Sequence, residues 1–194
     1  MLRAKALEMT ADAFLIWNLS QDQKYELLDG VSVPLHAQLS ATARHDMIVV
    51  NLICLLANRL AGTRFHPTTS ALGLRTAMKR VRRPDVTIES AAGTPDSLEV
   101  REPVVVFEVL SPSNRPSEIV RKIEEYKRHP AIRHIVLVEP GEISVTRLSR
   151  SGDGTWTDTT YVDLADMLML DPPGVELPLA EIYEGLGPLE PGTA

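Results

Sequence analysis

The sequence has a single cysteine and no apolar run long enough to cross a membrane. One cysteine excludes an internal disulfide framework and a cysteine-rich zinc module. The longest apolar block, residues 47–57, is interrupted by Asn51 and falls short of the about 20 residues that a transmembrane helix needs. Arg3 and Lys5 are not followed by an apolar stretch, so the N-terminus lacks the pattern of a secretory signal. These absences predict a cytoplasmic protein with no membrane association.

An excess of positive charge is also missing, because 20 basic and 26 acidic side chains give a net charge of −6. This balance argues against a protein that coats nucleic acid through bulk charge, so any such contact has to be local. The sequence also lacks a Gly-x-x-x-x-Gly-Lys phosphate loop, a Gly-x-Gly-x-x-Gly turn and a Gly-x-Ser-x-Gly elbow. These absences weigh against a P-loop NTPase, a nicotinamide enzyme and a serine hydrolase.

The length and the spacing of apolar residues predict one mixed α/β domain. The 194 residues are 44% hydrophobic and 24% charged, as in a globular chain. We expect an N-terminal extension over residues 1–9, the domain over 10–186 and a flexible tail over 187–194. A hairpin is indicated by Asp29-Gly30 between two apolar runs. Helices are predicted over 10–18, 42–60, 116–129 and 179–186, and strands over 65–70, 72–76, 84–88, 103–110, 134–138, 143–148 and 156–162.

Three carboxylates stand in apolar strand contexts, where an ionised group is costly unless it is paired or binds a metal. Glu108 interrupts the apolar strand 103–110, Asp85 begins the strand at 84–88, and Glu26 lies in the predicted hairpin. Taken singly, each has a structural explanation: an arginine partner, a turn after Pro84, or an outward-facing position. Taken together, they are the oxygen ligands that Mg²⁺ prefers.

A lysine and a basic stretch accompany the acids. Lys122 shares a helix face with Glu118 and Tyr126, so it either forms a surface pair with Glu118 or reaches the acids from the helix. The basic stretch lies just before Asp85 and has no acid between its members. It is either a phosphate-facing surface or a solvated hairpin tip. It consists of Arg75, Lys79, Arg80, Arg82 and Arg83.

Several strings resemble the Uma2 family, a member of the PD-(D/E)xK restriction-endonuclease-like superfamily, in order over almost the whole chain. They are Tyr25-Glu26-Leu27-Leu28-Asp29-Gly30, His45 at the start of a long helix, Arg83-Pro84-Asp85-Val86, Phe107-Glu108-Val109-Leu110-Ser111-Pro112-Ser113, Lys122 with Tyr126, and Ile135-Val136-Leu137-Val138-Glu139-Pro140. The resemblance implies a central mixed sheet flanked by helices, with Glu26, Asp85 and Glu108 as the acidic residues. The superfamily motif continues Glu-x-Lys, but Leu110 occupies the lysine position, and the resemblance implies that Lys122 replaces it.

These observations predict a metal-dependent phosphodiester hydrolase acting on DNA, of the endonuclease type. Asp85 and Glu108 are expected to hold Mg²⁺ or Mn²⁺ with help from Glu26, while Lys122 acts on the attacking water or the developing charge. The basic stretch is expected to contact phosphates, and a homodimer is a compatible assembly. The alternatives are a non-catalytic module that binds nucleic acid or protein, and a structural protein that does neither.

Overall fold

The computed structural model describes residues 8–35, 42–91, 93–111 and 115–192. Its largest element is a six-stranded sheet with the strand order β10-β9-β8-β7-β6-β3. The strands are β3 His66–Thr69, β6 Val86–Glu89, β7 Pro103–Val109, β8 His134–Glu139, β9 Ser144–Arg150 and β10 Trp156–Tyr161. Strands β7 and β8 are parallel, and the other neighbours are antiparallel. The mixed central sheet predicted from the sequence is therefore confirmed.

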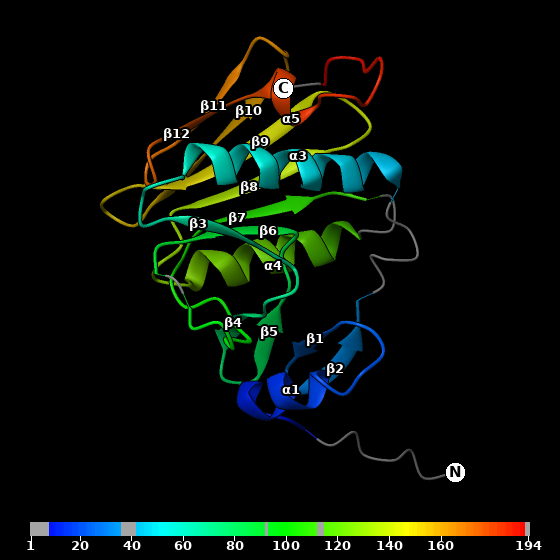
Figure 1. The fold of residues 1–194 in the computed structure, drawn as a ribbon, viewed down its shortest axis with the longest axis vertical. Coiled ribbons are helices and arrows are strands. Elements are labelled where there is room, and N and C mark those ends of the chain that lie inside the picture. The colour runs from blue at the N-terminus through cyan, green and yellow to red at the C-terminus, as the bar shows by residue number, and fades with distance from the viewer. Residues whose placement is uncertain (1–7, 36–41, 92, 112–114, 193–194) are drawn as a thin grey trace.

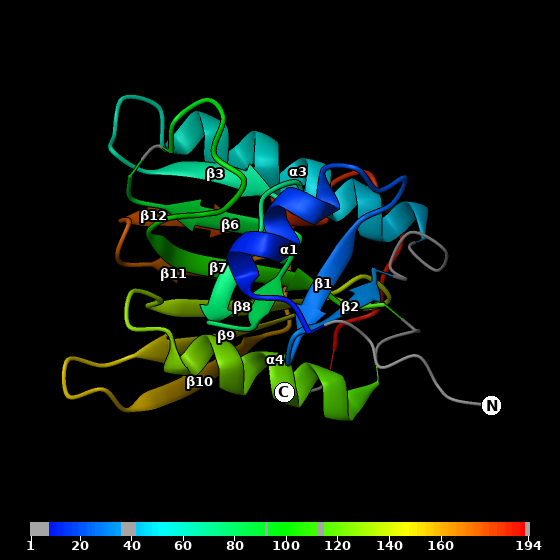
Figure 2. The same cartoon turned by 90° about the horizontal axis from the view of Figure 1, so that it is seen from below.

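Helices cover both faces of this sheet (Figures 1 and 2). The helices are α1 Ala11–Asn18, α3 Ala43–Arg59, α4 Pro116–Arg128 and α5 Leu179–Ile182. On one face of β7, Val105 and Phe107 pack with α3, and on the other face Val106 packs with Tyr126 of α4. Because side chains alternate along a strand, Glu108 lies on the α4 side, like Val106. Among the described helices, none has the length and apolar character that a membrane span requires.

A second sheet, with the order β2-β1-β5-β4, lies next to α1 at the end of the molecule where the chain begins (Figure 1). Its strands are β1 Tyr25–Leu28, β2 Val31–Pro34, β4 Leu74–Ala77 and β5 Arg80–Arg82. The turn between β1 and β2 is Asp29-Gly30, with φ of 52° and 85°, as a two-residue hairpin with positive φ at both positions requires. Leu27 of β1 and Val81 of β5 pack with Phe14 of α1. The predicted hairpin is thus present, whereas strand β5 was not predicted.

The C-terminal part adds a hairpin that the sequence analysis missed, β11 Met167–Leu170 paired with β12 Val175–Pro178. Helix α5 follows it, shorter than the predicted helix over 179–186, and the Asn51 side chain of α3 donates to the carbonyl of Ile182. Within the predicted flexible tail, the carbonyl of Glu190 accepts a hydrogen bond from the backbone N–H of Ile143, and the backbone N–H of Gly192 donates one to the carbonyl of Ile143. Part of this segment therefore lies against the start of β9.

Candidate active site

Two acidic residues meet where the start of β6 lies beside the end of β7. Asp85 directly precedes β6, and antiparallel pairing sets Val86 opposite Phe107. Asp85 Oδ2 accepts a hydrogen bond of 2.8 Å from the backbone N–H of Val109, the residue after Glu108. The side chains of Asp85 and Glu108 are 18% and 11% exposed, so solvent reaches both. The sheet register therefore brings these two carboxylates together.

Two side chains of α4 hold the carboxylate of Glu108. Lys122 Nζ lies 3.0 Å from its Oε2, and the Tyr126 hydroxyl donates a hydrogen bond of 2.6 Å to its Oε1. Lys122 and Tyr126 are four residues apart, so they share one face of the helix. Among the ion pairs between described residues, Lys122 pairs with Glu108 and Glu26 and not with Glu118. The lysine therefore reaches the acids from the helix side.

Burial and charge together set the ionisation of this group. Burial raises the pKa of Glu108, and Asp85 and Glu26 raise it further, while Lys122 acts in the opposite direction. Burial works against the ammonium of Lys122, but the carboxylates of Glu108 and Glu26 outweigh it and raise the pKa of the lysine. Burial also raises the pKa of the Tyr126 hydroxyl. The group therefore contains a fixed cation and a neutral hydroxyl donor next to the acids.

Glu26 is buried, and both of its carboxylate oxygens have partners. Oε2 accepts a hydrogen bond of 2.9 Å from Arg82, and Oε1 accepts one of 3.1 Å from the backbone N–H of Arg83. The same Oε1 lies 3.8 Å from Lys122 Nζ. Glu26 therefore joins the group through the ammonium of Lys122, and Asp85 and Glu108 are the acids that solvent reaches more directly.

His45, in the first turn of α3, lies against Asp85. Its Nε2 is 3.5 Å from Asp85 Oδ2, and its backbone N–H donates to Thr42 Oγ1, the N-cap of the helix. The hydrogen bond with Asp85 raises the pKa of His45, whereas burial opposes the shift. The sequence analysis did not place His45 or Tyr126 among the site residues. Two features of the sequence could have indicated them. His45 lies on the apolar stripe of its helix, and Tyr126 lies one helical turn after Lys122.

The structure corrects the phosphate-facing role expected of Arg82 and Arg83, two of the five residues of the basic stretch. Arg82 is fully buried, and its guanidinium donates to the carboxylates of Glu26 and Glu125. Arg83 is 5% exposed and donates to three backbone carbonyls. The other three basic residues form ion pairs: Arg75 with Asp12 and Glu99, Lys79 with Glu8, and Arg80 with Asp29 and Glu125. The reason for the difference is that β5 turns part of this stretch inward, toward acids distant in sequence.

The donor set of the site fits a magnesium-type ion held by two carboxylates. Among the described residues, no group of three or more His, Cys, Asp or Glu side chains is placed to hold a metal ion. Asp85 Oδ1 makes no hydrogen bond to the described residues, and each oxygen of Glu108 has a second lone pair. Mg²⁺ commonly uses one or two protein carboxylates and completes its shell with water and phosphate oxygens. Asp85 and Glu108 meet that requirement.

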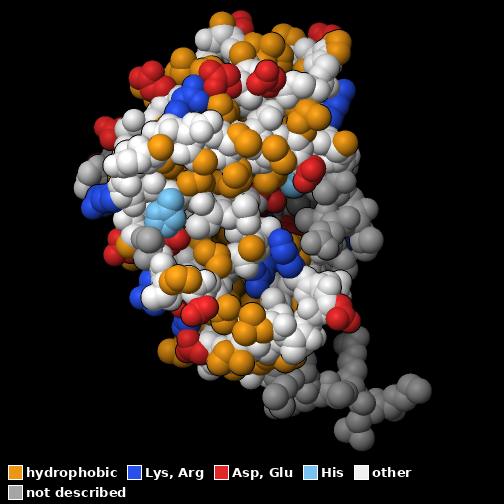
Figure 3. Space-filling model, in the orientation of Figure 1, with side chains coloured by type: hydrophobic (Ala, Val, Ile, Leu, Met, Phe, Trp, Pro, Cys, Tyr) orange, Lys and Arg blue, Asp and Glu red, His pale blue; other side chains and the backbone are white. Residues whose placement is uncertain are grey.

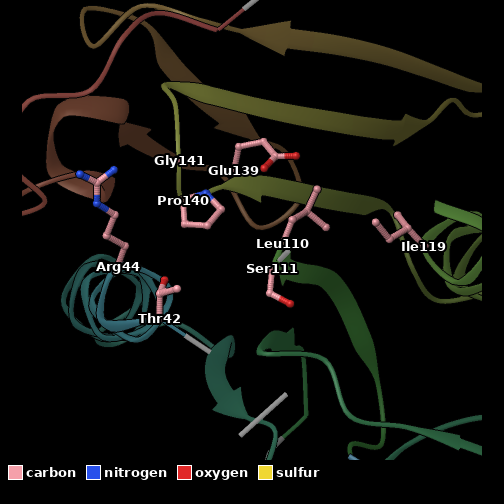
Figure 4. Close-up of a pocket in the computed structure, with 8 residues that line it drawn as sticks. All are labelled: Thr42, Arg44, Leu110, Ser111, Ile119, Glu139, Pro140 and Gly141. Carbon is pink, nitrogen blue, oxygen red and sulfur yellow. The ribbon is translucent and has the colours of Figure 1, made fainter. Parts of the chain in front are cut away.

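A cavity of about 350 Å³ lies next to the acids, beyond the carboxyl ends of β7 and β8. Figure 4 shows Thr42 and Arg44 at the start of α3, Glu139 and Pro140 at the end of β8, and Leu110 and Ile119 nearby. Leu110 and Ile119 also line the small space around Glu108 and Lys122. Glu26, Asp85, Glu108 and Lys122 are called the acid–lysine group below. The cavity therefore shares a wall with this group. Below, this space is called the β7–β8 cavity.

The fold and the acid–lysine group are consistent with the restriction-endonuclease-like class of proteins. The model of the Uma2 family, described as "Putative restriction endonuclease", matches residues 11–180, and the chain belongs to this family. The chain is also similar to the uncharacterized protein slr1290 of Synechocystis sp., with 26% identity over 181 residues that cover 92% of this chain and 93% of the relative. The resemblance stated from the sequence is thereby confirmed, and the family membership suggests a nuclease-like function.

Proposed function

We propose that this protein is a metal-dependent phosphodiester hydrolase that cuts DNA. The observation that carries the proposal is the contact between Glu108 and Lys122, 3.0 Å long, beside Asp85 at the end of the central strand. A pair of solvent-accessible carboxylates beside a protonated lysine can bind a hard cation and stabilise a charged phosphate at the same place. Membership of the Uma2 family, described as "Putative restriction endonuclease", supports DNA as the substrate.

Each residue of the site has its own role in the proposed hydrolysis. Asp85 and Glu108 would hold the divalent cation, Mg²⁺ or Mn²⁺, which would lower the pKa of a bound water and neutralise phosphate charge. Lys122 stays protonated, because the neighbouring carboxylates raise its pKa. It therefore acts as a fixed positive charge toward the phosphate and orients the attacking water by donating a hydrogen bond. Glu26 positions the ammonium of Lys122, and Tyr126 fixes the carboxylate of Glu108.

Leu110 occupies the position where the superfamily motif has its lysine. Lys122 supplies the same charge from the adjacent helix α4, because its ammonium lies against the carboxylate of the same motif residue, Glu108. A lysine that approaches from a helix and one that approaches along the strand can serve the same electrostatic purpose. The departure at Leu110 is therefore compatible with catalysis.

A non-catalytic binding module is the second candidate, and one observation favours it. The five basic side chains of residues 75–83 form hydrogen bonds within the fold, so less of their charge is available to phosphates. These hydrogen bonds bear on the affinity for DNA. They do not involve the contact between Glu108 and Lys122. We therefore retain the hydrolase as the first candidate, with a homodimer as a further prediction that sedimentation velocity can test.

Titration calorimetry with Mg²⁺ and Mn²⁺, followed by a plasmid-nicking assay, tests the proposal. Wild-type protein should bind one of these ions and nick plasmid DNA, and Asp85→Asn should lose both properties. Asp158→Asn, a change at an exposed position on β10 far from β6 in the sheet order, should behave like the wild type. Metal binding without cleavage of either plasmid or single-stranded DNA would support the non-catalytic module, and absence of both metal binding and cleavage would overturn the proposed metal site.

A further inference from the structure

We propose that the β7–β8 cavity receives one unpaired base of a DNA strand, next to the phosphate that is cut, so that single-stranded DNA is the preferred substrate. This inference deepens the proposed function and relies on it for the position of the scissile phosphate. The size of the cavity, its walls and the charge around it support an unpaired base as its occupant.

The size and position of the cavity suit one base and its sugar. Its volume of about 350 Å³ lies at the lower end of the range, about 300–1,000 Å³, in which proteins bind small organic groups. A duplex keeps its bases stacked and paired inside, so only a base that has left the stack can enter such a space. Leu110 and Ile119 separate the cavity from Glu108 and Lys122. A base held there would place an adjoining phosphate near the acid–lysine group.

The walls of the cavity combine apolar surfaces with a few polar groups. Leu110, Ile119 and Pro140 offer apolar contact to the faces of a base. Glu139 projects from the end of β8 toward the side where Leu110 and Ile119 lie (Figure 4), and its carboxylate makes no hydrogen bond to the described residues. Partial burial and the charge of Glu142 raise the pKa of Glu139, so a hydrogen-bond donor there relieves a cost. The exocyclic amino group of cytosine is such a donor.

The charge around the site also favours a small substrate segment. Arg44 is exposed at the mouth of the cavity and forms no ion pair among the described residues. By contrast, the basic stretch that could have followed a duplex backbone is neutralised by acids of the fold. Figure 3 shows acidic and basic side chains interspersed over one face of the molecule. A protein with this distribution can hold one or two phosphates more readily than a long duplex.

Binding to a short oligo-dC strand tests the proposal apart from catalysis. Fluorescence anisotropy in Ca²⁺ compares the strand with the same strand annealed to its complement. We expect the single strand to bind about 10-fold more tightly or better, because one hydrogen bond from a base to the Glu139 carboxylate is worth roughly that much. Equal or tighter binding of the duplex would overturn the proposal.

A cavity-filling substitution and a matched control locate the binding. Ile119→Trp fills the cavity and should weaken single-strand binding by about 10- to 100-fold, because the base then loses its hydrogen bond to Glu139. Val120→Trp adds the same side chain at the next position of α4, which is 59% exposed and outside the cavity, and should bind like the wild type. Equal binding by the two variants would overturn the proposal. If Ile119→Trp does not fold, Arg44→Ala and Glu139→Gln test the same cavity, and unchanged single-strand binding in both would overturn it.

The hydrolysis of bis(p-nitrophenyl) phosphate with Mn²⁺ separates failure of this inference from failure of the proposed function. This small diester needs the acid–lysine group but not the cavity. We expect wild-type protein to hydrolyse this diester, and Ile119→Trp to cleave oligo-dC about 10-fold or more slowly than wild-type protein does. Loss of diester hydrolysis in wild-type protein would refute the hydrolase, whereas wild-type cleavage of oligo-dC by Ile119→Trp would refute only the cavity proposal.

Discussion

Lys122 illustrates what a single buried cation does among several acids. The sequence analysis placed Glu26, Asp85 and Glu108 in one group, where three carboxylates alone would repel one another. The ammonium of Lys122 lies 3.0 Å from Glu108 and 3.8 Å from Glu26, so attraction offsets much of that repulsion. The same ammonium is the group that we propose faces the substrate phosphate. Structure and chemistry therefore depend on one side chain.

Lys122→Ala should keep metal binding but lower the cleavage rate. Lysine is not a proposed ligand, and the loss of one positioned electrostatic group typically reduces a rate by about 10²–10⁴-fold. Lys122→Arg should restore little, because a guanidinium is planar and bulkier than an ammonium. Single-turnover nicking with saturating Mn²⁺ measures the effect, and Lys127→Ala, in an exposed pair with Glu124, is the control. Wild-type cleavage by Lys122→Ala would remove the lysine from the mechanism.

Leu110→Lys in the Lys122→Ala background sharpens that result. It returns a lysine to the superfamily position, and the Leu110 side chain already lines the space around Glu108. A partial recovery of cleavage is expected, because the new ammonium approaches the same carboxylate from the strand. No recovery, together with retained folding, would show that the direction of approach from α4 is essential.

His134, at the start of β8, carries a prediction about pH. Its ring is buried between Ser149 and the carbonyl of Asp171, and burial lowers its pKa. The folded state therefore prefers the neutral ring, so the contribution to stability is complete above the unfolded pKa of about 6.5 and is lost as the pH falls below it. Melting temperatures at about pH 7.5 and about pH 5.5, on either side of that value, should differ less in His134→Gln than in wild-type protein. Equal differences in the two proteins would contradict this role.

At the scale of elements, β5 shows why a run of arginines can be misinterpreted. Three consecutive residues, Arg80-Val81-Arg82, form this strand, and Arg82 is directed into an acid pair formed by Glu26 of β1 and Glu125 of α4. The acids lie 56 and 43 residues away in sequence, so no local pattern reveals the pairing. The pattern of charges in the sequence indicated an unusual basic stretch. Which of its side chains face solvent depends on acids that are distant in sequence.

Arg82→Ala should strongly destabilise the protein. Arg82 is the fully buried cation between Glu26 and Glu125, and removing one member of a buried ion pair typically costs about 3–5 kcal/mol. Lys122 stays near Glu26, and Arg80 and Arg121 stay near Glu125. Lys79→Ala is the matched control from the same stretch, because its pair with Glu8 is exposed and worth about 1 kcal/mol or less. Urea denaturation gives both free energies of unfolding. A loss for Arg82→Ala no larger than that for Lys79→Ala would contradict the buried network.

The elements with strong local signals could be predicted from the sequence. Helix α3 begins after its cap Thr42 and ends before Gly62, and the Asp29-Gly30 turn lies where the dipeptide indicated. Hairpin β11–β12 was missed, because its short strands carry no hairpin dipeptide and the segment between them contains two prolines. Within the candidate site, the acids and Lys122 could be proposed from the sequence. The contacts of His45 and Tyr126 could not, because they depend on the docking of α3 and α4 on opposite faces of the sheet.

At the scale of the whole molecule, the distribution of charge limits how DNA can be held. The net charge is −6, and the acidic partners of residues 75–83 are spread over α1, the β1–β2 turn and α4. The fold thereby uses its densest basic stretch to join the small sheet to helices α1 and α4. In the proposed function, phosphate contacts are left to the cation that Asp85 and Glu108 would hold, to Lys122 and to Arg44. The proposal therefore expects a DNA strand to be held mainly at the site itself.

The salt dependence of DNA binding should reflect this small number of contacts. Each phosphate neutralised on a single strand contributes about −0.7 to the slope of log K against log [salt], so two or three contacts predict a slope of about −1.5 to −2. Anisotropy titrations of oligo-dC in Ca²⁺ over a range of KCl concentrations measure this slope. Arg44→Ala should make it shallower by about 0.7, because one contact is lost. A slope of about −5 or steeper would require around seven neutralised phosphates, and the ion pairs of residues 75–83 would then have to open to supply them.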